Sequence, residues 1–226
     1  MISQYEIKLI LSDFDGVILE SESVKDEAFF DCFSIFDNHI NDIMYYHRSN
    51  MTVNRYDKFE HIYERILKKP YSEKQKKYIS TRFNDIAYNK VINSNFIPGS
   101  IEFLKTYYKY VPIWVVSGTP KIELVRVLKF LKIKQFFQNF FSTPPNKTSI
   151  ITKIINNNNF NPKNIVYIGD MKNDCNAAKT NKIHFIGRKN LQLSKTDQCL
   201  GISNLKNIHD ILIIDKIKKK IFFELE

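Results

Sequence analysis

Two carboxylates that follow the first apolar run of the chain are the residues best placed to do chemistry. Asp13 and Asp15 come directly after a run that ends at Ser12, and Gly16 follows them. Residues at this spacing on a strand point to the same side, so both carboxylates would leave the strand end together. Carboxylates this close repel each other unless a cation or a shared proton lies between them. The pair suggests a metal site beside an acid or a nucleophile; the alternative is a strand-to-loop exit with two solvated aspartates.

Further polar residues stand where later strands are expected to end. Ser117-Gly118-Thr119 follows the second expected strand, and Gly169-Asp170, with Asp174 four residues on, follows the third. Lys147 lies just after the Pro144-Pro145 break and ahead of a helix. Taken singly, Ser117 is typical of a turn, Lys147 of a solvated lysine and Asp170 of a helix cap. If the strands are parallel neighbours, however, all these ends converge on one crevice.

The elements that would position these residues alternate between strands and helices. Apolar runs predict buried strands, and apolar residues at three- and four-residue steps predict helices. The expected strands are Ile7–Ser12, Val111–Val116, Phe136–Phe141, Asn164–Ile168 and Lys182–Ile186. The expected helices of this region are Ile101–Tyr107, Lys121–Leu131, Thr148–Ile155 and Asn173–Thr180. This alternation predicts an α/β fold, a three-layer Rossmann-like core whose parallel sheet is covered by helices on both faces.

The stretch from Glu22 to Ile92 breaks this alternation. Its apolar residues recur at helical spacing in three runs, around Phe29, around Ile62 and within Tyr78–Ile92, and no strand is predicted there. We therefore expect an all-α domain at residues 21–92, inserted into a core made of residues 1–20 and 93–226. The aromatic stripes of the insertion indicate core packing rather than a cofactor site.

Composition favours a soluble globular protein of the cytoplasm. The chain has 226 residues, of which 43% are hydrophobic and 26% charged. No apolar run approaches the ~20 residues of a membrane span, and Met1–Glu6 lacks the pattern of a secretory signal. The three cysteines, Cys32, Cys175 and Cys199, are widely spaced and form no CxxC pair, which favours reduced thiols.

The net charge of +10 is compatible with anionic partners. Lysines cluster at Lys74–Lys77 and Lys216–Lys220, without the interleaved aromatic residues that single-strand binders use. A field that concentrates phosphorylated metabolites, or simply a soluble surface, is therefore expected ahead of a nucleic-acid role.

The order and spacing of the polar residues resemble the motifs of the haloacid dehalogenase superfamily. The resemblance is to its phosphatase members with a helical C1-type cap, such as phosphoglycolate phosphatase and β-phosphoglucomutase-like proteins. Asp13-Phe14-Asp15-Gly16-Val17 looks like the first motif, Val115-Val116-Ser117 the second and Lys147 the third. Gly169-Asp170 with Asp174 looks like the fourth, and Pro98-Gly99 matches the usual return from the cap. The resemblance covers nearly the whole chain.

This resemblance implies roles for the carboxylates. Asp13 would be the nucleophile that forms an aspartyl-phosphate. Asp15 would protonate the leaving group and then activate water. The implied cofactor is Mg²⁺, which takes oxygen ligands. Its ligands would be Asp13, Asp170 and the backbone carbonyl of Asp15, with Asp174 close by or acting through water.

The resemblance also implies a phosphate-binding set. Ser117 and the backbone N–H of Gly118 would donate to phosphoryl oxygens, and Lys147 would supply a fixed positive charge. Lys153 is an alternative to Lys147, although it lies within the following helix.

Three positions depart from the usual motifs of the superfamily. Val17 stands where many members have threonine, and Thr148 where many have a proline after the lysine. Glu20-Ser21 replaces the more usual Asp-Ser or Asp-Thr, which concerns the cap hinge rather than the chemistry.

The expected activity is Mg²⁺-dependent hydrolysis of a small phosphate ester, of the sugar phosphate or phosphoglycolate class. A β-phosphoglucomutase-like sugar phosphomutase is the alternative enzyme, and a noncatalytic binding or nucleic-acid-interacting module on the same fold is the other alternative. The expected partner is the small-molecule phosphate ester, with no nucleic acid and no membrane, and the chain would act as a monomer or homodimer. Cap residues that could contact substrate are Lys25, His47, Arg48 and Arg55.

Overall fold

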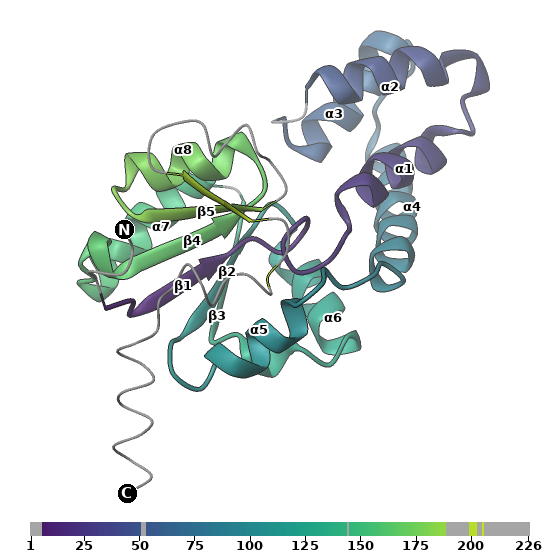
Figure 1. Ribbon diagram of the computed structural model, residues 1–226. Coiled ribbons are helices and arrows are strands. Elements are labelled where there is room, and N and C mark those ends of the chain that lie inside the picture. The colour runs from purple at the N-terminus through teal and green to yellow at the C-terminus, as the bar shows by residue number, and fades with distance from the viewer. Residues whose placement is uncertain (1–5, 51–52, 144, 189–198, 203–204, 206–226) are drawn as a thin grey trace, which may run out of the picture. The chain divides into compact units, whose positions relative to one another are not determined.

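The computed structural model describes residues 6–50, 53–143, 145–188, 199–202 and 205 (Figure 1). The chain divides into a sheet unit, Met1–Glu20 with Asn95–Glu226, and a helical unit, Ser21–Ser94. The boundaries expected from the sequence, after residues 20 and 92, lie within two residues of these. The Lys216–Lys220 cluster and the first five residues lie outside the described part.

Six strands of the described chain form one parallel sheet. They are β1 (Leu9–Ser12), β2 (Ile113–Ser117), β3 (Asn139–Ser142), β4 (Ile165–Gly169), β5 (His184–Arg188) and β6 (Cys199–Ile202), in the order β3-β2-β1-β4-β5-β6. The last of these was not predicted from the sequence. Because β1 pairs with β2 on one side and β4 on the other, Ser12 lies beside Val115 and Ile168. The strand order reverses here, and parallel sheets bind ligands at such a point, beyond the carboxyl ends of the strands.

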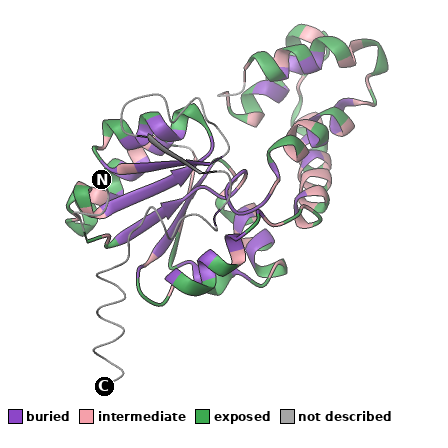
Figure 2. Ribbon diagram, in the orientation of Figure 1, coloured by how far each residue is buried: buried purple, intermediate pink, exposed green. Residues whose placement is uncertain are grey.

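Helices cover both faces of this sheet. The helices of the sheet unit are α5 (Ser100–Tyr107), α6 (Lys121–Phe130), α7 (Lys147–Asn158) and α8 (Lys172–Thr180). Helices α7 and α8 pack on the sheet face that carries Leu11 and Tyr167, and α5 and α6 lie on the other side (Figure 1). The strands β1, β2 and β4 are buried along their whole length, and β5 is buried from Phe185 onward (Figure 2). The expected three-layer α/β fold is confirmed.

The start of α7 is set by its N-terminal cap. Asn146 has extended backbone, and its side-chain oxygen accepts a hydrogen bond from the N–H of Ser149 at 2.9 Å. Such a cap satisfies one of the first N–H groups of a helix, which otherwise have no intrahelical partner. The cap places Lys147 in the first turn of the helix, one residue earlier than the sequence pattern predicts.

The helical unit packs around aromatic side chains. Its elements are α1 (Glu22–Phe33), the 3₁₀ turn η2 (Asp37–His39), α2 (Ile40–Ser49), α3 (Arg55–His61), the π-helical turn η3 (Ile62–Ile66) and α4 (Glu73–Ile92). Phe29, on α1, lies near the middle of this core, with the rings of Phe33 and Phe59 4.9 and 5.9 Å away. The apolar runs of the insertion thus form a core of their own, as the sequence pattern indicates.

A buried histidine belongs to the same core. The ring of His47 stacks on Phe29 at 3.8 Å, and its Nδ1 lies 3.3 Å from Nζ of Lys58. Nζ of Lys58 also donates to the carbonyl oxygen of His47 at 3.1 Å. On the other side of the ring, Nε2 lies 3.5 Å from Oδ1 of Asp26, which itself pairs with Arg48. Burial, reinforced by the charge of Lys58, lowers the pKa of His47 to about 4.

This pKa predicts that the helical unit loses stability as the pH falls. Between the ordinary histidine pKa of 6.5 and the folded value of about 4, the unfolded chain binds a proton that the folded chain does not. The free energy of unfolding should therefore decrease across this window, by on the order of 2–3 kcal/mol. His47→Asn keeps an acceptor near the position of Nδ1 but cannot titrate. The variant should be less stable than the wild type at pH 8, with the difference shrinking towards pH 5.

Amide hydrogen exchange in α1 and α2 provides the measurement, after correction for the intrinsic exchange rate at each pH. Asp13, whose pKa is raised by burial, also responds to acid, but it lies in the sheet unit and is unchanged between the two proteins. A stability difference that stays constant from pH 8 to pH 5 would contradict the assignment.

Candidate active site

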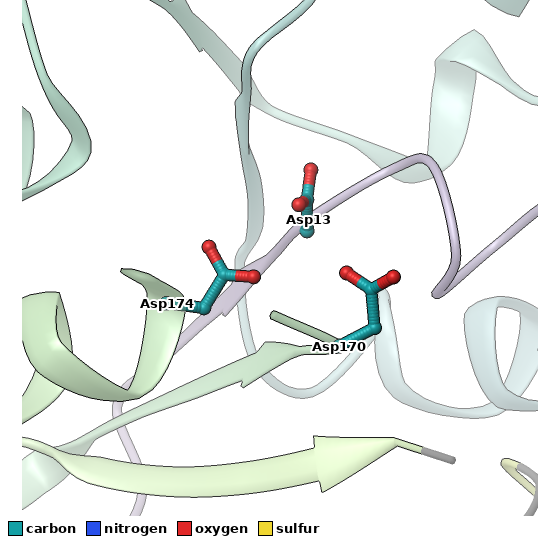
Figure 3. Close-up of side chains that lie close together, drawn as sticks. All are labelled: Asp13, Asp170 and Asp174. Atoms are coloured by element: carbon teal, nitrogen blue, oxygen red, sulfur yellow. The ribbon is translucent and has the colours of Figure 1, made fainter. Parts of the chain in front are cut away.

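Three aspartates meet at the carboxyl ends of β1 and β4. Asp13 follows β1, Asp170 follows β4, and Asp174 lies in the first turn of α8. One carboxylate oxygen of each lies within 4.8 Å of the others, and all three side chains are buried. Figure 3 shows the carboxylates directed towards one another. The pairing of β1 with β4 accounts for this convergence, because the N–H of Asp13 donates to the carbonyl oxygen of Ile168 at 2.9 Å.

Lys147 joins two of these aspartates. Its Nζ lies 2.5 Å from Oδ2 of Asp13 and 2.6 Å from Oδ1 of Asp174. The lysine side chain is 9% exposed, so its charge is nearly removed from water. Lys153, the alternative weighed from the sequence, lies exposed on α7. The lysine that contacts the carboxylates is therefore Lys147.

The carboxylate of Asp174 accepts three hydrogen bonds. In addition to Lys147, its Oδ1 accepts a hydrogen bond from the hydroxyl of Tyr167 at 2.9 Å. Its Oδ2 accepts from the backbone N–H of Met171 at 3.1 Å. Burial raises the pKa of Tyr167 well above its ordinary value, so this hydroxyl stays protonated and acts as a donor. These bonds fix the carboxylate while leaving it lone pairs for a further ligand.

The buried negative charge of the cluster favours the binding of a cation. Three carboxylates and one ammonium leave a formal charge of −2 among buried groups, which is costly unless it is compensated. Burial, with the nearby charges of Asp174 and Asp15, raises the pKa of Asp13 to about 6 even though Lys147 opposes the shift. Burial alone would lower the pKa of Lys147, but Asp13 and Asp174 raise it above its ordinary value. A hard divalent cation with oxygen ligands, such as Mg²⁺, fits this donor set and this charge.

The side chain of Asp15 contacts the loop after β2. Its Oδ2 accepts a hydrogen bond from the hydroxyl of Thr119 at 3.0 Å. The N–H of Thr119 in turn donates to Oγ of Ser117, the fully buried last residue of β2, at 3.0 Å. The two aspartates of the first motif therefore have different surroundings: Asp13 contacts an ammonium, and Asp15 a hydroxyl.

Gly16 lets the loop after β1 approach Asp170. Its φ of +73° lies in the left-handed region, and a Cβ built there would be 2.0 Å from Oδ2 of Asp170. Arg188, at the end of β5 and 4% exposed, holds the same loop by donating from Nη1 to the carbonyl oxygen of Gly16 at 2.9 Å. Its guanidinium also pairs with Glu20. The backbone next to Asp15 is therefore held by a residue of β5, two strands away in the sheet.

The basic residues proposed as substrate contacts lie in the helical unit, and three of them have clear partners within it. Arg48 pairs with Asp26 at 2.7 Å, and His47 is stacked in the core as described above. Nη1 of Arg55 donates to Oδ1 of Asn84 at 2.8 Å, and its guanidinium lies 4.9 Å from the centre of the Phe83 ring. Lys25, on α1, is partly exposed. Contact of these residues with substrate stays a prediction.

Sequence reasoning missed three residues of this site. The sequence pattern indicates Tyr167 only as a strand residue and Thr119 only as part of the loop after a strand, and it gives no indication of Arg188. The available signals were weak: a tyrosine three residues before Asp170, and a hydroxyl two residues after Ser117. Each of these residues contacts a partner at least seven positions away in the sequence.

The glycine contacts predict a graded effect of added methyl groups. Gly16→Ala would place Cβ against Asp170 at an unfavourable φ, and Gly169→Ala would place it 2.5 Å from Cβ of Asp174. Both should lower the free energy of unfolding of the sheet unit, by about 1–3 kcal/mol. At Gly118 the nearest atom is 4.0 Å from a built Cβ, so Gly118→Ala should change stability by less than about 1 kcal/mol.

Urea unfolding followed by the fluorescence of Trp114, the single tryptophan and a residue of β2, measures all three variants. Gly118→Ala is the matched control, because it makes the same chemical change in a loop of the same sheet edge. Equal stability of the Gly16 and Gly118 variants would contradict the close approach to Asp170.

The sequence of the chain matches a known protein family. Residues 10–188 match the family model of the haloacid dehalogenase-like hydrolases. A search of curated proteins returned no match. Among the helices that the structure describes, none combines the length and apolar character of a membrane span.

Solved structures share the fold at low sequence identity. A predicted phosphoglycolate phosphatase from Haemophilus somnus is 18% identical, with a TM-score of 0.68, over 91% of this chain and 97% of that one. A structure named as a candidate β-phosphoglucomutase from Thermotoga maritima is 18% identical, with a TM-score of 0.67, over 92% and 100%. A candidate hydrolase of the superfamily from Bacillus subtilis, bound to magnesium, is 14% identical, with a TM-score of 0.71, over 92% and 99%. With the family match extending over most of its length, the chain belongs to the haloacid dehalogenase-like hydrolases.

Proposed function

We propose that the protein is a Mg²⁺-dependent phosphomonoester hydrolase that acts on a small phosphorylated metabolite through an aspartyl-phosphate intermediate. The observation that carries this proposal is the buried cluster of Asp13, Asp170 and Asp174 with Lys147 between two of its members. Membership of a hydrolase family supports the reaction type.

Asp13 is the proposed nucleophile. Its Oδ1 accepts the N–H of Phe14 at 2.7 Å, and its Oδ2 contacts Lys147, so the carboxylate is held in one orientation. One of its oxygens forms a bond to phosphorus while the bond from phosphorus to the ester oxygen breaks. Water then attacks phosphorus, which releases inorganic phosphate and regenerates the carboxylate. Two displacements of this kind replace one more difficult hydrolysis.

The proposed metal ligands are Asp13, Asp170 and Asp174, with the backbone carbonyl of Asp15. A bound Mg²⁺ supplies positive charge that lets an anionic nucleophile approach an anionic phosphate and offsets charge developing on its oxygens. The magnesium-bound structural neighbour supports this choice of cation.

Asp15 is the proposed acid and base. It would give a proton to the leaving oxygen in the first step and take one from water in the second. Ser117 accepts the N–H of Thr119 at its Oγ and so keeps its own hydroxyl hydrogen for a phosphoryl oxygen. The N–H of Gly118 and the ammonium of Lys147 would complete the phosphate site.

The substrate class and the alternative reaction rest on the structural neighbours. A predicted phosphoglycolate phosphatase supports a phosphoglycolate or sugar phosphate substrate. A candidate β-phosphoglucomutase supports a sugar phosphomutase, which would use the same two aspartates but retain the phosphoryl group through substrate reorientation. Release of inorganic phosphate from a hexose 1-phosphate without formation of the 6-phosphate would exclude the mutase.

Replacement of the nucleophile should abolish turnover without unfolding the protein. Asp13→Asn keeps the shape of the side chain but removes its nucleophilic charge, so kcat for p-nitrophenyl phosphate should fall by at least about 10³-fold. Asp42→Asn makes the same change at an exposed position of α2 and serves as the control. Thermal unfolding checks that both variants are folded. Wild-type activity in Asp13→Asn would rule out the proposed chemistry.

Metal dependence can be measured by stability as well as by activity. EDTA should inactivate the enzyme, and added Mg²⁺ should restore turnover. A ligand that binds only the folded state raises its stability, so Mg²⁺ should also raise the Tm of the wild type. Asp170→Asn should remove most of this rise, because it deletes one anionic ligand. A Tm that is indifferent to Mg²⁺ in the wild type would argue against a resident cation.

A further inference from the structure

We propose that Thr119 is a positioning residue that orients Asp15 for proton transfer, an inference that rests on the proposed phosphomonoesterase function. Its hydroxyl donates to Oδ2 of Asp15 at 3.0 Å across 104 residues of sequence. The contact therefore joins the loop after β1 to the loop after β2, two neighbouring strands of the sheet.

Thr119 is itself held in place. Its backbone N–H is bound to Oγ of Ser117, which fixes the turn that follows β2. That turn is held in addition by Thr143, the residue after β3, whose N–H donates to the carbonyl oxygen of Ser117 at 3.1 Å. The hydroxyl of Thr143 also donates to the carbonyl oxygen of Gly118 at 3.3 Å. A donor on so constrained a turn can impose an orientation on its acceptor.

The backbone of Asp15 is fixed on its own side. Asp15 forms a bridge with Leu19, and the N–H of Gly16 donates to the carbonyl oxygen of Leu19 at 2.8 Å. With the backbone fixed, the direction of the carboxylate depends on its two side-chain dihedral angles. The bond from Thr119 restrains both angles by holding Oδ2.

This contact determines which carboxylate oxygen of Asp15 transfers the proton. With Oδ2 bound to Thr119, the proton that Asp15 transfers belongs on Oδ1. As the bond between Asp13 and phosphorus forms and the ester bond breaks, that proton passes to the leaving oxygen, which departs as an alcohol. In the second step Oδ1 takes a proton from the attacking water as the bond between phosphorus and Asp13 breaks.

The alternative is that Thr119 only stabilises the turn after Ser117, since hydroxyl residues are common in such loops. The two readings differ in how the leaving group affects the loss of activity. p-Nitrophenolate leaves readily without a proton, whereas a benzyl alkoxide does not. A misplaced acid should therefore slow the hydrolysis of benzyl phosphate far more than that of p-nitrophenyl phosphate, while a damaged turn should slow both alike.

The experiment compares kcat/KM for these two esters in the wild type, Thr119→Val and Thr119→Ser. Thr119→Val should lower the value for benzyl phosphate by about 10–100-fold and that for p-nitrophenyl phosphate by less than about threefold. Thr119→Ser should restore the values to within about threefold of the wild type, because it returns the hydroxyl. Thr143→Val removes the hydroxyl that contacts Gly118 but keeps the backbone N–H that holds Ser117, so it should leave the ratio between the two esters unchanged.

A double-mutant cycle makes the test specific to Asp15. In an Asp15→Asn background, Thr119→Val should no longer change the ratio between the two esters, because the residue that it positions can no longer transfer the proton. Equal losses on both esters in Thr119→Val, or no loss on either, would overturn the inference while leaving the hydrolase proposal intact. Failure of the wild type to hydrolyse either ester would overturn the proposed function and this inference with it.

Discussion

The structure depends on how buried negative charge is compensated where the strands end. The ammonium of Lys147 lies between carboxylates contributed by the end of β1 and the start of α8, 134 and 27 residues away in the sequence. Buried charges of one sign are tolerated only when they are paired, hydrogen-bonded or bound to a metal. The contact therefore fixes the N-terminus of α7 relative to two other elements. It also leaves a residual negative charge that the proposed cation would neutralise.

Around this contact the position of each carboxylate is set by small features of the backbone. Glycines at positions 16 and 169 allow Asp170 and Asp174 to lie where a methyl group would otherwise be. Tyr167 reaches Asp174 from the sheet face beneath α7 and α8, which makes part of the apolar core a support for the site. The helical unit is stabilised differently, by stacked aromatic rings with one histidine among them.

Much of this arrangement could be predicted from the sequence, because apolar runs mark strands and polar residues just beyond them mark a shared edge. This pattern predicts that Asp13, Asp170, Asp174 and Lys147 lie near one another, and the structure brings them together. The pattern could not identify Tyr167, since a tyrosine within an apolar run is equally typical of core packing. Nor could it pair Thr119 with Asp15, because such a contact depends on strand order and register. The strand β6 and the separate helix α2 were missed for other reasons. The strand has only four residues, too few for a clear pattern, and the helical spacing of Ile40, Ile43 and Met44 in α2 falls inside a stretch that was predicted to be helical as a whole.

Because β1 lies between β2 and β4, the sheet cannot assemble around it until later parts of the chain have been translated. Both neighbours of β1 come later in the chain, β2 from residue 113 and β4 from residue 165. During synthesis the apolar residues Leu9, Ile10 and Leu11 therefore emerge long before a strand can cover them, while the whole helical unit, residues 21–94, is already available to fold. Pairings between distant segments form slowly and leave apolar surface exposed meanwhile. Asp13, the proposed nucleophile, is thus translated long before β2 and β4, and its surroundings can be assembled only after both strands have emerged.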